Sequence, residues 1–115
     1  MDIETLRNYC LKKKHVAECF PFDAKILVFK VMGKMFALTN LERVPSSVNL
    51  KCDPEKALEL RAHYSEIIIP GYHMSKKHWN TVLLNNRLPQ KMYMELINHS
   101  YDLVVKGLPK KKKQF

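Results

Sequence analysis

The segment from Pro70 to Trp79 concentrates side chains of the types that contact nucleic acids. It reads Pro-Gly-Tyr-His-Met-Ser-Lys-Lys-His-Trp and holds the only tryptophan and two of the five histidines of the chain. The Pro-Gly pair favours a turn, which presents the residues that follow it. Lysines can hold phosphates, and aromatic rings can stack on bases. We therefore expect a contact surface formed by Tyr72, His73, Lys76, Lys77, His78 and Trp79.

A purely structural interpretation of the same segment stays open. A single tryptophan is usually a packing residue, and a short pair of lysines usually faces water. In that interpretation Trp79 anchors the core, while Lys76 and Lys77 make the surface soluble and contact no partner.

Other kinds of chemistry have weaker support in the sequence. His73 and His78 are five residues apart without a second ligand pair, so we expect no metal site. Cys52 is the best candidate nucleophile, but the neighbouring Asp53 would raise the pKa of its thiol. With three glycines the chain has no glycine-rich phosphate loop. We expect neither an enzyme nor a bound cofactor.

Length and charge limit the class of protein. The 115 residues, 46% of them hydrophobic, suffice for one domain with one core. The formal charge is +9, and Lys110–Lys113 supply four of these charges, so the remainder is still basic. Such an excess favours phosphate backbones, anionic lipid or acidic proteins as partners.

The cysteines and the hydropathy predict the compartment. The three cysteines are widely spaced and form no CxxC pair, which is typical of reduced thiols in a cytosolic protein. The first residues lack the pattern of a signal peptide, and no apolar run is long enough to span a bilayer. We therefore expect a soluble, cytoplasmic protein that does not enter a membrane.

The first half of the chain predicts one helix and three strands. Asp2 is a suitable N-cap for a helix over residues 2–14, with Lys12, Lys13 and Lys14 in its last turn. Phe20-Pro21-Phe22 is expected to hold a loop onto the core. Residues 26–31 and 34–38 read as a hairpin around Met32-Gly33, and residues 44–51 read as a third strand of an antiparallel meander.

The second half predicts two further helices and two strands. Asp53-Pro54-Glu55 is a strong helix start, and that helix should run to His63 and bury Ala57, Leu58 and Leu60. Residues 67–69 and 79–84 are the strand candidates. A last helix begins at Pro89, carries an apolar stripe and stops at Gly107 and Pro109. Residues 110–115 read as a mobile basic tail.

Four motifs, in this order, resemble the MmcQ/YjbR-like family over nearly the whole chain. They are Val28-Phe29-Lys30-Val31 with Gly33-Lys34-Met35-Phe36-Ala37-Leu38, Leu50-Lys51-Cys52-Asp53-Pro54-Glu55, the Pro70 to Trp79 segment, and Ser100-Tyr101-Asp102-Leu103-Val104-Val105 with Leu108-Pro109-Lys110-Lys111. The resemblance implies a CyaY-like α+β fold, similar in architecture to frataxin, for residues 1–109. It also implies a DNA-binding role through a double-wing surface, and no catalytic residues. Many members have glycine where this chain has Asp23, so that turn is expected to differ.

The DNA hypothesis assigns a role to each basic segment. The hairpin and the strand from Trp79 would act as wings, with Lys30, Lys34, Lys76 and Lys77 meeting phosphates. Because no obvious recognition helix carries Arg or Asn, binding would be mostly electrostatic. Iron binding of the frataxin kind is not expected, since the first helix has only two carboxylates, Asp2 and Glu4.

A protein-interaction module is the alternative function. Tyr72, Met74 and Trp79 would form its exposed anchor patch, and such side chains are favoured at interfaces. Salt separates the two functions, because a DNA complex weakens steeply with salt and an apolar interface changes little. Our prediction is a monomer that binds nucleic acid, DNA in the first place.

Overall fold

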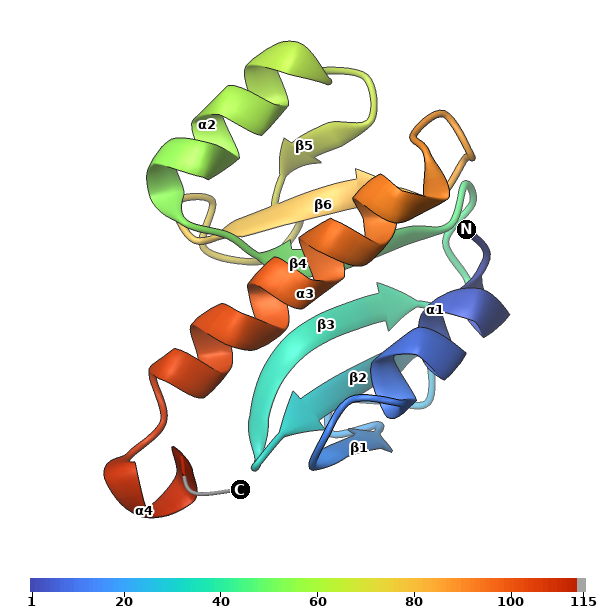
Figure 1. The fold of residues 1–115 in the computed structure, drawn as a ribbon. Coiled ribbons are helices and arrows are strands. Elements are labelled where there is room, and N and C mark those ends of the chain that lie inside the picture. The colour runs from blue at the N-terminus through green and yellow to red at the C-terminus, as the bar shows by residue number, and fades with distance from the viewer. Residues whose placement is uncertain (114–115) are drawn as a thin grey trace.

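Strands β1 to β6 pair into one antiparallel sheet whose order is β1-β2-β3-β4-β6-β5 (Figure 1). The computed structural model describes residues 1–113 of the chain. The strands are β1 (Val16–Cys19), β2 (Ile26–Val31), β3 (Lys34–Asn40), β4 (Ser47–Lys51), β5 (Ile68–Pro70) and β6 (Trp79–Leu83). The helices are α1 (Ile3–Leu11), α2 (Pro54–His63), α3 (Gln90–Lys106) and α4 (Lys110–Lys113). The predicted α+β class, with an antiparallel sheet and flanking helices, is confirmed.

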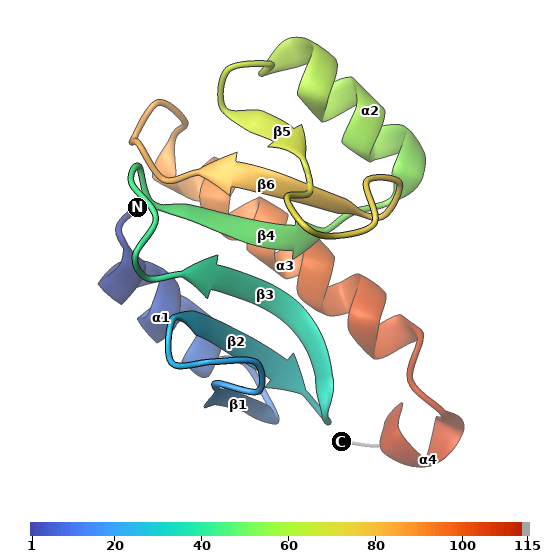
Figure 2. The same cartoon turned by 180° about the vertical axis from the view of Figure 1, so that it is seen from behind.

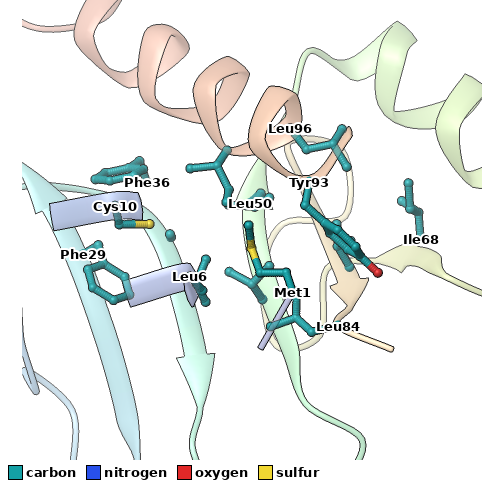
Figure 3. Packing of buried hydrophobic residues seen from close by; sticks show 14 of the residues in the cluster. Met1, Leu6, Cys10, Phe29, Phe36, Leu50, Ile68, Leu84, Tyr93 and Leu96 are labelled. Carbon is teal, nitrogen blue, oxygen red and sulfur yellow. The ribbon is translucent and has the colours of Figure 1, made fainter. Parts of the chain in front are cut away.

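One face of the sheet is covered by α1 and α3, and we call it the helix face (Figures 1 and 2). Its core joins α1 residues such as Leu6 and Cys10 to Phe29, Phe36 and Tyr93, and all five are fully or almost fully buried (Figure 3). Burial of one large apolar side chain stabilises a fold by about 1.5–3 kcal/mol. The helix face therefore supplies most of the apolar stabilisation.

The predicted hairpin is present, and a bulge follows it in β3. Met32 and Gly33 have φ values of 49° and 84°, the positive values that a tight hairpin turn requires. Phe29 pairs with Ala37 but Lys30 pairs with Met35, so Phe36 is an extra residue in β3. Phe36 and Ala37 therefore both belong to the core on the helix face.

A serine of α3 forms hydrogen bonds with two strands beside this bulge. The Ser100 hydroxyl donates to the carbonyl of Phe36 at 2.5 Å and accepts from the backbone N–H of Lys51 at 2.9 Å. These two bonds connect β3 to β4 where direct pairing is limited to two residues of each strand. The long helix α3 is thereby fixed to the centre of the sheet.

The first predicted helix is shorter than expected. It ends at Leu11, and Lys12 is its C-cap, so the three lysines do not occupy its last turn. The ammonium of Lys13 instead lies 4.9 Å from the ring centroid of Tyr9 and 5.1 Å from that of Tyr101. Lys13 is half-buried and also donates to Asn98, so it is a packing residue between α1 and α3.

Four other expectations need correction. The short strand β1 was missed, and the third predicted strand begins at Ser47 instead of residue 44. Leu58 is 64% exposed, although Ala57 beside it is buried as predicted. Phe20 and Phe22 are 49% and 63% exposed and do not hold their loop onto the core.

The C-terminal region agrees with the sequence up to Gly107, which caps α3 as expected. Residues 110–113 then form the short helix α4, where we predicted a tail without regular structure. The last part of that tail, residues 114–115, lies outside the described residues. Within residues 1–113, no helix combines the length and apolar character needed to cross a membrane.

Candidate nucleic-acid interface

The sheet face opposite α1 and α3 is bordered by two loops, and we call it the loop face (Figure 2). The loops are residues 20–25 between β1 and β2, and residues 71–78 between β5 and β6. Strand alternation places Val28, Leu38 and Trp79 here in a small buried cluster, separate from the main core. Trp79 is 9% exposed, so its expected place on the contact surface is wrong and the structural interpretation of this residue holds.

The loop 71–78 is held against the sheet by a chain of hydrogen bonds. The N–H of Tyr72 donates to the Thr81 hydroxyl at 2.9 Å, and that hydroxyl donates to Oδ1 of Asn49 at 2.6 Å. The amide of Asn49 then donates back to the carbonyl of Tyr72 at 3.2 Å. Because Thr81 is fully buried, this closed ring of bonds fixes the start of the loop.

Gly71 permits this close approach. A Cβ at this position would lie 2.8 Å from the Cβ and from the carbonyl oxygen of Trp79. The N–H of Gly71 also donates to that oxygen at 2.9 Å. The Pro-Gly pair therefore matters for backbone contact with β6 as well as for turning the chain.

The predicted contact residues of this loop separate into two groups. Tyr72 and His73 line a pocket on the loop face, with ring centroids 4.1 Å apart. Lys76 and Lys77 line a different hollow, together with Leu58 of α2. Lys76, Lys77 and His78 are all exposed, and the ammonium of Lys76 donates to the carbonyl of Gly71 at 3.2 Å.

The other predicted lysines lie on β2 and β3. Lys30 is half-buried on the loop face. Lys34 is exposed at the start of β3, where it lines a hollow with Lys51 and with the last turn of α3. Lys51 pairs with Trp79, two residues after Lys77. Lys34, Lys51 and Lys77 thus mark one end of the sheet, which we call the basic end.

The hollow lined by Tyr72 and His73, which we call the loop-face pocket, has a volume of about 500 Å³. Its lining combines apolar residues, Ile26, Leu38 and Met74, with the polar strand residues Asn40, Ser47 and Asn49. Phe22 comes from one bordering loop and Tyr72 from the other. The guanidinium carbon of Arg43 lies 4.8 Å from the centroid of the Tyr72 ring, which is a cation–π distance.

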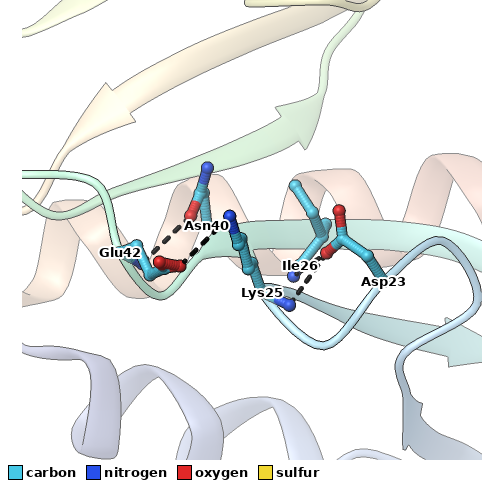
Figure 4. A network of polar contacts seen from close by, with 5 residues as sticks. All are labelled: Asp23, Lys25, Ile26, Asn40 and Glu42. Atoms are coloured by element: carbon cyan, nitrogen blue, oxygen red, sulfur yellow. Dashed lines mark hydrogen bonds and ion pairs between the residues drawn. The ribbon is translucent and has the colours of Figure 1, made fainter.

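The loop that carries Phe22 is closed by Asp23, the residue where the family pattern was expected to differ. Its carboxylate accepts from the N–H groups of Lys25 at 2.8 Å and Ile26 at 3.1 Å (Figure 4). Lys25 pairs with Glu42 at 3.6 Å, and Glu42 donates its N–H to Asn40 Oδ1 at 3.0 Å. The end of β3 is thereby connected to this loop.

The buried thiols are poor nucleophiles. Burial raises the pKa of Cys10 to about 12 and is also the main cause that raises the pKa of Cys52. Both groups therefore carry their protons at neutral pH. Among residues 1–113, no cluster of three His, Cys, Asp or Glu side chains could hold a metal ion.

The model of the YjbR family matches residues 11–103, which is most of the chain. The chain belongs to the YjbR family. It is 41% identical over 108 residues to the uncharacterised protein YbdF of Escherichia coli O157:H7, covering 94% of this chain and 88% of YbdF. It is 33% identical over 114 residues to the uncharacterised protein YjbR of Escherichia coli K12, covering 99% of this chain and 96% of that protein.

Two solved structures have folds similar to that of this chain. A crystal structure of a Deinococcus radiodurans protein with a DUF419 domain has a TM-score of 0.91 and 42% identity, covering 97% of this chain and 85% of that one. A crystal structure of a Pseudomonas syringae protein has a TM-score of 0.74 and 29% identity, covering 90% of this chain and 98% of that one. The resemblance inferred from the four motifs is confirmed.

Two residues that line the loop-face pocket were not predicted from the sequence. Phe22 was assigned to the core because its loop has no apolar periodicity from which a direction could be inferred. Arg43 follows β3 in a polar turn and carries no local motif. Of the predicted protein-binding anchors, Tyr72 is 55% exposed, Met74 is half-buried and Trp79 is buried.

Proposed function

We propose that this chain binds DNA through the loop face and the basic end of its sheet. The observation that carries the proposal is the distribution of charge on the strands. Among the six described strands, Glu18 is the only acidic residue, and its carboxylate is held by Arg7 of α1 on the helix face. Lys30 and Lys51 lie on the loop face, so this face offers positive charge without a strand carboxylate beside it.

The cations of this surface are available to a ligand. The ion pairs among residues 1–113 use Arg7, Lys25, Arg87 and Lys91. None of these pairs includes Lys30, Lys34, Lys51 or Lys77. An ammonium group with no carboxylate partner can contact a phosphate without first breaking an ion pair, and each such contact releases counterions from DNA.

Exposed aromatic rings on the same face add a second kind of contact. Phe22 and Tyr72 project from the two bordering loops and are both more than half exposed. Because rings stack on bases without regard to sequence, the proposal predicts affinity for DNA with little base-specific selection.

The test is the salt dependence of binding, measured by fluorescence anisotropy with labelled duplex and single-stranded DNA between about 50 and 200 mM salt. Lys34→Ala/Lys77→Ala removes two exposed cations of the basic end. The slope of log affinity against log salt should become smaller by about 2, since each phosphate contact contributes roughly 0.9.

Arg87→Ala/Lys91→Ala is the matched control. It removes the same charge near the opposite end of the sheet, where Arg87 follows β6 and pairs with Glu66 at 3.1 Å. For this control, the slope of log affinity against log salt should stay close to that of the wild type. The proposal is wrong if both double variants reduce this slope by the same amount. It is also wrong if the folded wild-type chain binds neither form of DNA at low salt.

A further inference from the structure

We infer that the loop-face pocket holds one unpaired base of a single-stranded nucleic-acid segment. This inference rests on the proposed function and makes it more specific, because it assigns the site to a flipped or unpaired base instead of an intact duplex. The pocket volume of about 500 Å³ lies within the range of about 300–1,000 Å³ that is common for small-ligand sites.

The shape of the pocket suits a flat ring. Phe22 and Tyr72 come from opposite loops, and the same pocket is lined by the apolar Leu38 and Met74. Two large aromatic side chains that are 63% and 55% exposed gain burial when a planar group enters between them. A base has two apolar faces and a polar edge, which matches a lining that combines apolar and polar side chains.

The Tyr72 ring is positioned before any ligand arrives. Its backbone is fixed by the bonds to Thr81 and Asn49, while the Arg43 guanidinium lies on its ring and His73 lies beside it. A ring held in this way loses little conformational freedom on binding, so more of the stacking free energy appears as affinity.

The rim offers one unused donor and one unpaired cation. Oδ1 of Asn40 accepts from Glu42, whereas the amide nitrogen of Asn40 has no partner among residues 1–113 and points away from that bond (Figure 4). Arg43 forms none of the ion pairs among these residues. Asn40 can donate to an acceptor on the base edge, and Arg43 can contact the adjoining phosphate.

The carboxylates near the rim are already engaged. Glu42 pairs with Lys25, and the carboxylate of Asp23 accepts two backbone N–H groups. Accepting N–H groups leaves the negative charge of Asp23 in place, so the cation that can contact a phosphate here is Arg43, which has no carboxylate partner among residues 1–113. An acidic protein would supply the charge but not the flat, unpaired ring that fits between the two loops.

The direct experiment compares two probes that differ only in their bases. One is a labelled oligodeoxythymidine of about eight nucleotides, and the other is an abasic strand of the same length that keeps every phosphate. Wild-type protein should prefer the base-bearing strand by roughly 5- to 150-fold, the equivalent of stacking one base. Tyr72→Ala should remove that preference, while Tyr72→Phe should keep it.

Phe22→Ala and Phe20→Ala form a matched pair. Both residues are exposed phenylalanines of the same loop, but only Phe22 lines the pocket. Phe22→Ala should lower the preference for the base-bearing strand, and Phe20→Ala should leave it unchanged. Circular dichroism of each variant checks that the fold is intact.

The outcomes separate this inference from the proposed function. If wild-type protein binds both strands equally and Lys34→Ala/Lys77→Ala weakens both, DNA binding stands and the base pocket is wrong. If neither strand binds, the proposed function itself is wrong. If free thymidine monophosphate displaces the oligomer at equal concentration, the pocket takes a free nucleotide and its assignment to a strand is wrong.

Discussion

The helix face and the loop face are the two sides of the same sheet, yet they are covered to different extents. On the helix face, α1 and α3 cover the strands and leave a continuous apolar core. On the loop face, two loops cover only a small cluster around Val28, Leu38 and Trp79, and a pocket stays open between them. The first arrangement stabilises the fold, and the second leaves polar and aromatic groups available for binding.

The loop face also depends on fewer interactions. The position of Tyr72 relies on the absence of a Cβ at Gly71 and on one buried hydroxyl, that of Thr81. The helix face distributes its stabilisation over many apolar contacts. Single substitutions should therefore separate stability from binding.

The largest effect is expected for Phe29→Ala on the helix face. Phe29 is fully buried in the main core, so truncation should lower the free energy of unfolding by about 3–5 kcal/mol. Urea denaturation measures this loss, and Phe29→Leu provides a milder variant if the first does not fold. Phe22→Ala on the loop face should change stability by less than about 0.5 kcal/mol. Equal losses at both positions would remove the distinction between the two faces.

Gly71→Ala should have the next largest effect. The new methyl group would meet Trp79 at 2.8 Å, so the loop or β6 must shift, and overpacking of this kind costs about 1–3 kcal/mol. Gly107→Ala is the control, since a Cβ there meets only carbonyl oxygens at 3.6 Å. Thermal denaturation should distinguish the two variants. If they are equally stable, the close contact between Gly71 and Trp79 does not determine the loop position.

Thr81→Val should have a smaller effect on stability and a specific effect on the loop. It removes the hydroxyl that accepts from the N–H of Tyr72 and donates to Asn49, at a cost of about 1–2 kcal/mol. Hydrogen exchange should show faster exchange of the Tyr72 amide. Thr39→Val is the matched control, because its buried hydroxyl donates to the carbonyl of Ser47 and not to the loop. Equal protection of Tyr72 in both variants would contradict the assigned role of Thr81.

The smallest effect concerns pH and His99 of α3. Burial, with a further contribution from Lys56, lowers the pKa of His99, and its Nε2 accepts from the N–H of Asp53 at 3.1 Å. The unfolded chain therefore binds the proton more readily, so this stabilisation is complete above the unfolded pKa of about 6.5 and decreases as pH falls below it. Urea denaturation at neutral and mildly acidic pH should show a smaller loss of stability for His99→Gln than for the wild type. An unchanged loss would assign the pH dependence to other groups.

Period-two alternation and turn chemistry predicted most of the fold. The hairpin around Met32-Gly33, the helix from Pro54 and the stop at Gly107 each follow from local rules, and each is present. The bulge at Phe36 could not be predicted in this way, because a continuous apolar run does not show which residue is unpaired. The bonds from Ser100 to two strands join residues distant in sequence, so no local pattern indicates them.

The candidate site was predicted only in part. The sequence predicted that the loop with Tyr72 and His73 belongs to the site. It also predicted that the lysines and the aromatic rings of that loop lie on one surface. The structure separates them, because the backbone of Tyr72 is bound to the sheet while Lys76 and Lys77 lie beside α2. Arg43 and Phe22 reach the pocket from other loops, a proximity that depends on the order of the strands.

Amide NMR shift mapping during a titration with single-stranded oligodeoxythymidine locates the binding surface residue by residue. If the loop face binds the strand, the shifts will concentrate on Phe22, Asn40, Asn49 and the 71–78 loop, with further shifts at the basic end and few in α1 or the first turns of α3. Shifts centred on the helices, or scattered evenly over all lysines, would contradict the assignment of the loop face as the binding surface.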